Sequence, residues 1–89
     1  MTGSDDELFR FPCEFPIKVM GRESDDFRSL TRAIVERHAG PLEATKINER
    51  PSAKGNFLAL TYTIEAQSRA QLDAIYQDLT SSGVVLVAL

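Results

Sequence analysis

The sequence predicts a single α+β domain whose strands and helices follow the order βαββαβ. Two segments, residues 14–22 and 57–66, alternate apolar and polar side chains with a period of two, which is typical of half-buried strands. Two others, residues 24–39 and 68–81, repeat apolar side chains at helical spacing. A chain of 89 residues is long enough for one modest core without disulfides or metal.

The first predicted strand, residues 14–22, points Phe15, Ile17 and Val19 to one face and ends at Gly21. The helix that follows covers residues 24–39. Its signals are Ser24 as N-cap, acidic residues in the first turn, and Gly40 followed by Pro41 at its end. Its expected apolar stripe is Phe27, Leu30, Ile34 and Val35.

Residues 43–50 form a polar strand candidate whose charges suit the edge of a sheet. Residues 51–56 are dense in turn formers, so a hairpin leads into the strand at 57–66. This strand is expected to turn one face toward the helices, through Leu58, Leu60, Tyr62 and Ile64.

Ser68 and Gln71 have the spacing of a capping box, which starts the second helix. Its apolar stripe is Leu72, Ile75, Tyr76 and Leu79, and a Ser-Ser-Gly sequence ends it. Residues 84–89 are all apolar and form the last predicted strand.

Right-handed crossovers between non-adjacent strands turn this order into a ferredoxin-like sandwich, with a four-stranded antiparallel sheet and both helices on one face. We expect residues 14–89 to form this domain. Residues 1–13, acidic and then apolar, are expected to form a semi-ordered N-terminal arm.

The composition narrows the classes of function. Lysine and arginine total 10 against 13 aspartate and glutamate, a net charge of −3, which disfavours nucleic acid as a partner. Cys13 is the only cysteine, so no cofactor or metal is predicted from thiolate ligands. The acidic start does not resemble a signal peptide, and no apolar run approaches about 18 residues. We therefore expect a cytoplasmic protein without membrane contact.

Several segments together resemble the YbeD-like family of small bacterial proteins. They are Phe-Pro at 11–12, Phe-Pro-Ile-Lys-Val-Met-Gly at 15–21, Arg-His-Ala at 37–39 and Pro-Ser-Ala-Lys-Gly-Asn-Phe at 51–57. The resemblance covers residues 8–89. It implies a βαββαβ fold similar to ACT-type regulatory domains, no established activity, and an association with lipoate-metabolism genes that indicates neighbourhood rather than mechanism.

Three catalytic or nucleic-acid patterns are incomplete. Cys13 and His38 are the only thiol and imidazole, and no pattern supplies an orienting acid. The loop at 21–28 offers Arg22 and Arg28 to an acylphosphatase-type phosphate site, but it has one glycine and three carboxylates. Residues 54–57 resemble the start of an RNA-binding motif, with the aromatic residues out of phase.

An effector site is a further hypothesis for the loop after the first strand. Gly21 would allow close backbone approach, and Arg22 and Ser24, with the first helical amides, would hold a small anion. The alternative is that Gly21 only makes the turn and Ser24 only caps the helix.

The last strand is apolar on both faces, and the topology places it at a sheet edge. An open apolar edge invites pairing, so we expect Val85, Val87 and Leu89 to form an interface. A second copy of the chain, another protein or the N-terminal arm would cover it.

The sequence thus favours a non-enzymatic regulatory or adaptor domain that binds a small effector or another protein. The alternatives are a small hydrolase of acylphosphatase type and an RNA-contacting module.

Overall fold

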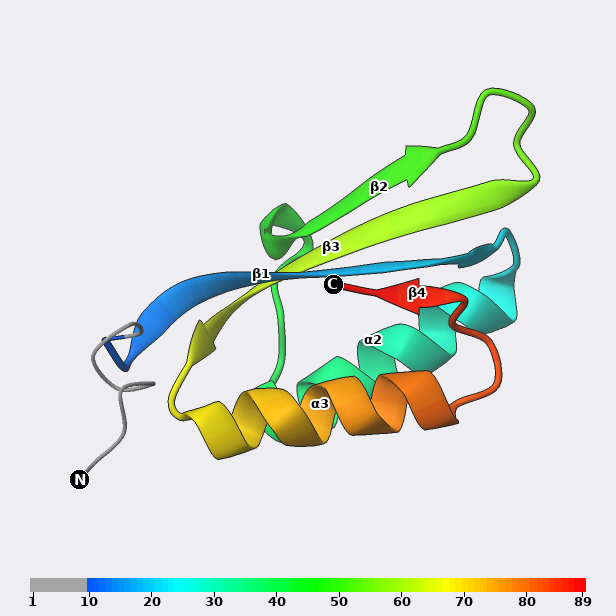
Figure 1. Cartoon of the computed structure of the whole chain (residues 1–89). Coiled ribbons are helices and arrows are strands. Elements are labelled where there is room, and N and C mark those ends of the chain that lie inside the picture. The colour runs from blue at the N-terminus through cyan, green and yellow to red at the C-terminus, as the bar shows by residue number, and fades with distance from the viewer. Residues whose placement is uncertain (1–9) are drawn as a thin grey trace.

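The computed structural model describes residues 10–89, which form a four-stranded antiparallel sheet with two helices on one face (Figure 1). The sheet order β2-β3-β1-β4 means that a strand of one βαβ half separates the two strands of the other. This is the predicted ferredoxin-like sandwich. Its strands are β1 Cys13–Arg22, β2 Ile47–Pro51, β3 Phe57–Ala66 and β4 Val87–Ala88, and its helices are α2 Asp25–Ala39 and α3 Arg69–Ser81.

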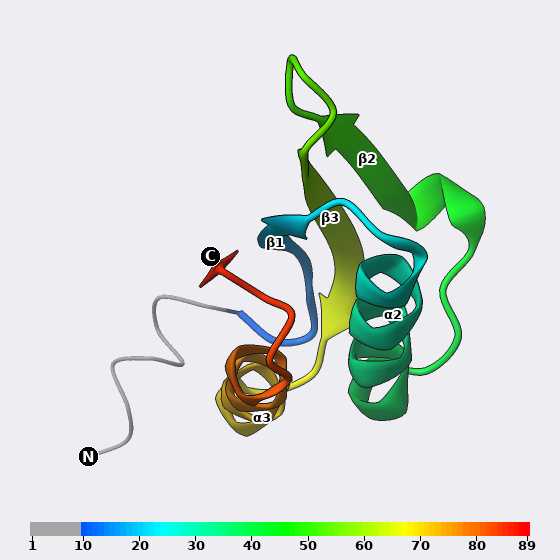
Figure 2. The same ribbon diagram turned by 90° about the vertical axis from the view of Figure 1, so that its right-hand side faces the viewer.

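The core lies between the sheet and the helical layer. The long central pair β1–β3 supplies much of it, with Ile17 opposite Tyr62 and Val19 opposite Leu60. The predicted stripe of β3 is confirmed, since all four of its apolar members are buried. The opposite face of the sheet is covered by no described element (Figures 1 and 2).

The ends of α2 follow the predicted capping signals. The Ser24 hydroxyl accepts a hydrogen bond from the Phe27 amide at 3.0 Å, and Gly40 follows the last turn with φ of +84°. The predicted stripe is wrong at one position: Leu30 is 37% exposed and Thr31 is fully buried in its place. Thr31 fits there because its hydroxyl donates to the Phe27 carbonyl at 2.7 Å and contacts the Tyr62 hydroxyl at 2.6 Å.

The start of α3 uses the predicted capping residues in a different arrangement. Ser68 Oγ accepts from the Gln71 amide at 3.1 Å, as a capping box requires. The Gln71 side chain accepts from the Gln67 amide at 2.7 Å and donates to the His38 carbonyl at 3.0 Å. One side chain therefore links the start of α3 to the end of α2.

The strand predicted at residues 43–50 begins later than expected. A short 3₁₀ helix, η1 Ala44–Lys46, precedes β2 and leads the chain from the helical layer to the sheet edge (Figure 2). This turn closes with a hydrogen bond from the Lys46 amide to the Glu43 carbonyl. No periodic pattern marks so short a turn.

The strand predicted at residues 84–89 is reduced to the two residues of β4. Val84 and Val85 belong to no strand and pack against the core. The ladder with β1 is extended only by hydrogen bonds of Leu86 to Met20 and of Leu89 to Lys18. The edge is thus much shorter than the apolar run suggested.

The predicted N-terminal arm is only partly described. Residues 1–9 lie outside the described part, Phe11 packs against the core, and Cys13 already belongs to β1, opposite Ala66. No helix within residues 10–89 has both the length and the apolar character needed to cross a membrane.

Candidate functional site

The three residues predicted to bind an effector point in different directions. Gly21 is buried on the inner face of β1, where a Cβ atom would lie 2.5 Å from both the Phe27 ring and the Val84 carbonyl oxygen. Arg22 is on the outer face, with its guanidinium 5.5 Å from the centre of the Phe57 ring. Ser24 Oγ is used in the cap of α2. The close approach that Gly21 permits is made by the protein itself, and the effector site stays a prediction.

The loop between β1 and α2 also engages its second arginine. Arg28 forms ion pairs with Glu23, with Glu49 at 3.2 Å and with Asp25 at 3.5 Å. Its hydrogen bonds to Glu23 and Glu49 raise the pKa of the guanidinium above its ordinary value. A guanidinium surrounded by carboxylates is poorly placed to bind a phosphate.

The lone thiol and imidazole do not form a described pair. His38 Nε2 lies 2.6 Å from Asp78 Oδ2, which links the two helices, and Cys13 packs against the core at the start of β1. Among residues 10–89 no cluster of three or more metal-ligating side chains occurs.

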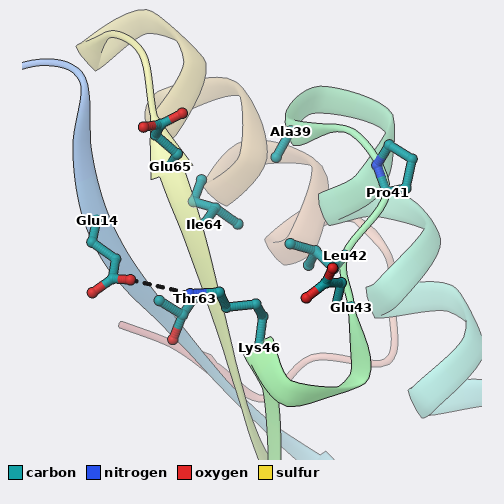
Figure 3. Close-up of a pocket in the computed structure, with 9 residues that line it drawn as sticks. All are labelled: Glu14, Ala39, Pro41, Leu42, Glu43, Lys46, Thr63, Ile64 and Glu65. Atoms are coloured by element: carbon teal, nitrogen blue, oxygen red, sulfur yellow. Dashed lines mark hydrogen bonds and ion pairs between the residues drawn. The ribbon is translucent and has the colours of Figure 1, made fainter.

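A pocket of about 420 Å³ lies where the loop after α2 approaches the ends of β1 and β3 (Figure 3). The loop is held by Glu36, whose carboxylate accepts from the Leu42 amide at 2.8 Å, and by Arg32, which donates to the Leu42 carbonyl at 2.9 Å. The Leu42 amide, and then Arg32, lower the pKa of Glu36. The pocket is lined by Glu14, Ala39, Pro41, Leu42, Glu43, Lys46, Thr63, Ile64 and Glu65.

The chemistry of this pocket is mixed. Ala39, Leu42 and Ile64 form an apolar floor, while Glu14 and Lys46 pair at 3.2 Å across its rim (Figure 3). All four charged side chains are exposed. The pocket therefore holds no buried charge that would select a ligand, and sequence patterns did not reveal it because its walls come from four separate segments.

The outer face of the sheet carries a more distinctive surface, which we call the Met20 face. The register places Arg50, Ala59, Met20 and Val87 in one row across all four strands. The next rows add Phe57 with Arg22 on one side, and Lys18 with Leu89 on the other. The Met20 face is thus Lys18, Met20, Arg22, Arg50, Phe57, Ala59, Val87 and Leu89.

Two shallow hollows lie on the Met20 face and share Met20 and Ala59. One, of about 200 Å³, reaches Arg50 and Phe57, and the other, of about 90 Å³, reaches Lys18 and Val87. Each hollow is thus mostly apolar and has one cation beside it.

The three predicted interface residues separate into two groups. Val87 and Leu89 belong to the Met20 face and are 44% and 71% exposed, respectively. Val85 is half-buried against the core. An interface that uses this strand would therefore take Val87 and Leu89 together with the open sheet rather than the strand alone.

Comparison with known proteins agrees with the fold. The model of a family described as a protein of unknown function, DUF493, matches residues 6–89. UPF0250 proteins of Chromobacterium violaceum and Paraburkholderia phytofirmans are 43% and 40% identical over 89 residues, with 100% of both chains covered. The solution structure of protein HP0495 from H. pylori has a TM-score of 0.75 at 17% identity, covering 100% of this chain and 96% of that one.

These relatives carry no named activity, and the likeness to HP0495 shows the fold alone. The match to the family model and the similarity to UPF0250 proteins also confirm the resemblance to the YbeD-like family. The chain belongs to the DUF493 family of small bacterial proteins of unknown function.

Proposed function

We propose that this protein is a non-enzymatic adaptor domain that binds a protein partner through the Met20 face. The observation that carries the proposal is the position of the exposed large apolar side chains. Among residues 10–89 there are six, and four of them, Met20, Phe57, Val87 and Leu89, lie on this face. Leu86 directly precedes β4, and only Leu30 lies elsewhere, on α2. Clustered exposed apolar surface is typical of contact sites.

The edges of the sheet support a contact through its face. β4 has two residues, and β2 carries the polar residues 48–50 and ends at Pro51, which lacks an amide donor. Short, charged or proline-containing edge strands resist pairing with another chain. The open face has no comparable protection.

The alternatives have less support. A hydrolase of acylphosphatase type would need cations in the loop after β1, where Arg28 already pairs with three carboxylates. An RNA-binding module of this topology stacks two or three bases on several aromatic side chains of its sheet. The Met20 face has one, Phe57, and Arg22 already lies over its ring.

Site-specific photocrosslinking tests the proposal. A photoreactive amino acid replaces Met20 in the full chain, expressed in its native cells, and a matched variant carries it at Leu30, which is comparably exposed on α2. We expect one dominant protein adduct at position 20 and none at position 30. Mass spectrometry identifies the adduct, and the purified partner is then titrated with the chain.

Binding of that purified partner decides the result. We expect Val87→Asp and Leu89→Asp to weaken it by about tenfold or more, which corresponds to about 1.4 kcal/mol, and Leu30→Asp to leave it unchanged. Equal crosslinking at positions 20 and 30, or equal loss of binding with Leu30→Asp, would contradict the proposal.

A further inference from the structure

The cations of the Met20 face surround its apolar centre. Lys18 and Arg22 stand two residues from Met20 on β1, about 7 Å along the same face. Arg50 lies two strands away in the same row, about 10 Å from Met20. No acidic side chain stands in these three rows. The nearest acids of the outer face, Glu14 and Glu65, lie opposite each other in the register, with Glu14 four residues before Lys18 on β1.

These cations differ from the arginines of the helical layer. All four arginines of α2 and α3, namely Arg28, Arg32, Arg37 and Arg69, form ion pairs with carboxylates. Within residues 10–89, Lys18, Arg22 and Arg50 form none. All three are exposed. Arg10 and Lys54, which lie outside this face, also form none within residues 10–89. The chain as a whole is acidic, whereas the charged side chains of this face are all positive.

On the basis of the proposed function, we infer that the partner presents an acidic segment with apolar side chains to the Met20 face. Its apolar side chains occupy the two hollows beside Met20, and its carboxylates meet Lys18 and Arg50, one beside each hollow. Complementary charge of this kind fixes the register of a complex and excludes competing partners.

A second copy of this chain is a poor occupant. Stacking two Met20 faces centre to centre opposes three cations with three cations, and the face carries no acidic side chain to relieve the repulsion. RNA carries the right charge but would contact the apolar side chains of Met20, Val87 and Leu89 where bases need stacking surfaces. An acidic protein segment satisfies both the charge and the hollows.

Selection from a library of random dodecapeptides displayed on phage tests the inference. The immobilised full chain is the target, and the Lys18→Glu, Arg50→Glu double variant is the counter-target. Arg10→Glu with Lys54→Glu is the matched control, because it has the same net charge and alters two exposed cations outside the Met20 face. Amide shifts of the ¹⁵N-labelled chain then map where the selected peptides bind.

We expect enriched peptides that combine aspartate or glutamate with large apolar residues and that shift the amides of Met20, Ala59 and Val87. Their binding should weaken with added salt, fall by about tenfold or more in the double variant and persist in the control. Neutral or basic peptides on the same residues would overturn the acidic preference and leave the adaptor role standing. Peptides that map elsewhere, or no enrichment over the double variant, would also overturn it.

Two further experiments test the other candidate occupants of the Met20 face, RNA and a second copy of the chain. A single-stranded RNA dodecamer that shifts the same amides at lower concentration than the peptides would overturn the inference in favour of nucleic acid. A dimer of the purified chain, seen by sedimentation and lost in the double variant but retained in the control, would overturn it in favour of a second copy. Failure of the crosslinking at Met20 would instead count against the proposed function itself.

Discussion

One side of the sheet is covered by the helical layer and the other forms the Met20 face. The two sides hold the same kinds of residue in different environments. On the helical side, the apolar side chains that face the sheet are buried and every arginine of α2 and α3 forms an ion pair with a carboxylate. On the other side, apolar side chains are exposed and three cations have no carboxylate partner among residues 10–89. On the first side, these apolar side chains and arginines find their partners within the chain. The second side leaves its apolar side chains and cations exposed, as the proposed contact with a partner requires.

The largest expected contrast lies within one strand. Ile17 is fully buried and Met20 is 44% exposed, although both belong to β1. Ile17→Ala should lower the free energy of unfolding by about 2–5 kcal/mol, because it leaves a cavity in the core. Met20→Ala should lower it by less than about 1 kcal/mol. Urea denaturation measures both, and equal losses would show that the outer face is structural.

Gly21 tests how closely the inner side of the sheet is packed. A methyl group at this position would clash with the Phe27 ring and the Val84 carbonyl, so Gly21→Ala should cost about 1–3 kcal/mol of stability. Phe27→Leu should relieve part of the clash. A double-mutant cycle by urea denaturation should therefore show coupling above about 0.5 kcal/mol, and additive losses would show that the ring does not fill this space.

The buried hydroxyl pair between α2 and β3 should respond unequally to its two deletions. Thr31→Val leaves the Tyr62 hydroxyl without its partner and should cost about 1–3 kcal/mol. Tyr62→Phe leaves Thr31 bonded to the Phe27 carbonyl and should cost about 0.5–1.5 kcal/mol. Thr80→Val is the control, since exposed Thr80 bonds only the backbone of its own helix. A larger loss of stability in Tyr62→Phe than in Thr31→Val, measured by thermal unfolding, would contradict this assignment.

The same tyrosine should make stability fall at alkaline pH. Burial raises the pKa of Tyr62 above 10.0, although its bond to Thr31 opposes the shift, and burial also raises that of Tyr76. The native state therefore keeps these protons more tightly than the unfolded state does. The stabilisation that the two tyrosines contribute is complete below their pKa in the unfolded state. It is lost as the pH rises through their pKa in the native state. Urea midpoints between about pH 9 and pH 11 should fall less steeply in Tyr62→Phe. An unchanged slope would contradict the prediction.

The smallest effect on stability is expected on the Met20 face. Lys18→Glu with Arg50→Glu should change the free energy of unfolding by no more than about 0.5 kcal/mol, because neither side chain forms an ion pair within residues 10–89. Circular dichroism during urea denaturation checks this. A large loss would show that the two cations support the fold rather than a partner.

Periodicity predicted the elements well because each depends on one burial pattern. The alternation in β1 and β3 and the stripe of α3 required no knowledge of neighbouring segments. Thr31 was missed because its burial opposite the Tyr62 hydroxyl depends on how α2 packs against β3, which the periodicity of α2 does not encode. The shortness of β4 was missed because Val84 and Val85 obtain their burial from the core rather than from strand pairing.

The candidate surfaces were less predictable than the fold. Lys18 and Met20 could be placed on an outer face from the alternation of β1 alone. Their meeting with Arg50 and Val87 depends on the strand order and register, which a single strand does not encode. Val85, Val87 and Leu89 were predicted to form an interface. Val85 is half-buried against the core, and the contact through Val87 and Leu89 remains a prediction.

The double role of Gln71 has a consequence for how the domain opens. The side-chain amide of Gln71 binds both the Gln67 amide before α3 and the carbonyl of His38 near the end of α2. Fraying of either helix end therefore breaks a hydrogen bond of the side chain that also holds the other end. Helix ends normally exchange their amide hydrogens independently and fast. Here the Gln67 amide should exchange with solvent together with the amides that close α2, and Gln71→Ala should separate the two rates. This side chain thereby joins the two βαβ halves through their helix ends, directly after the end of β3.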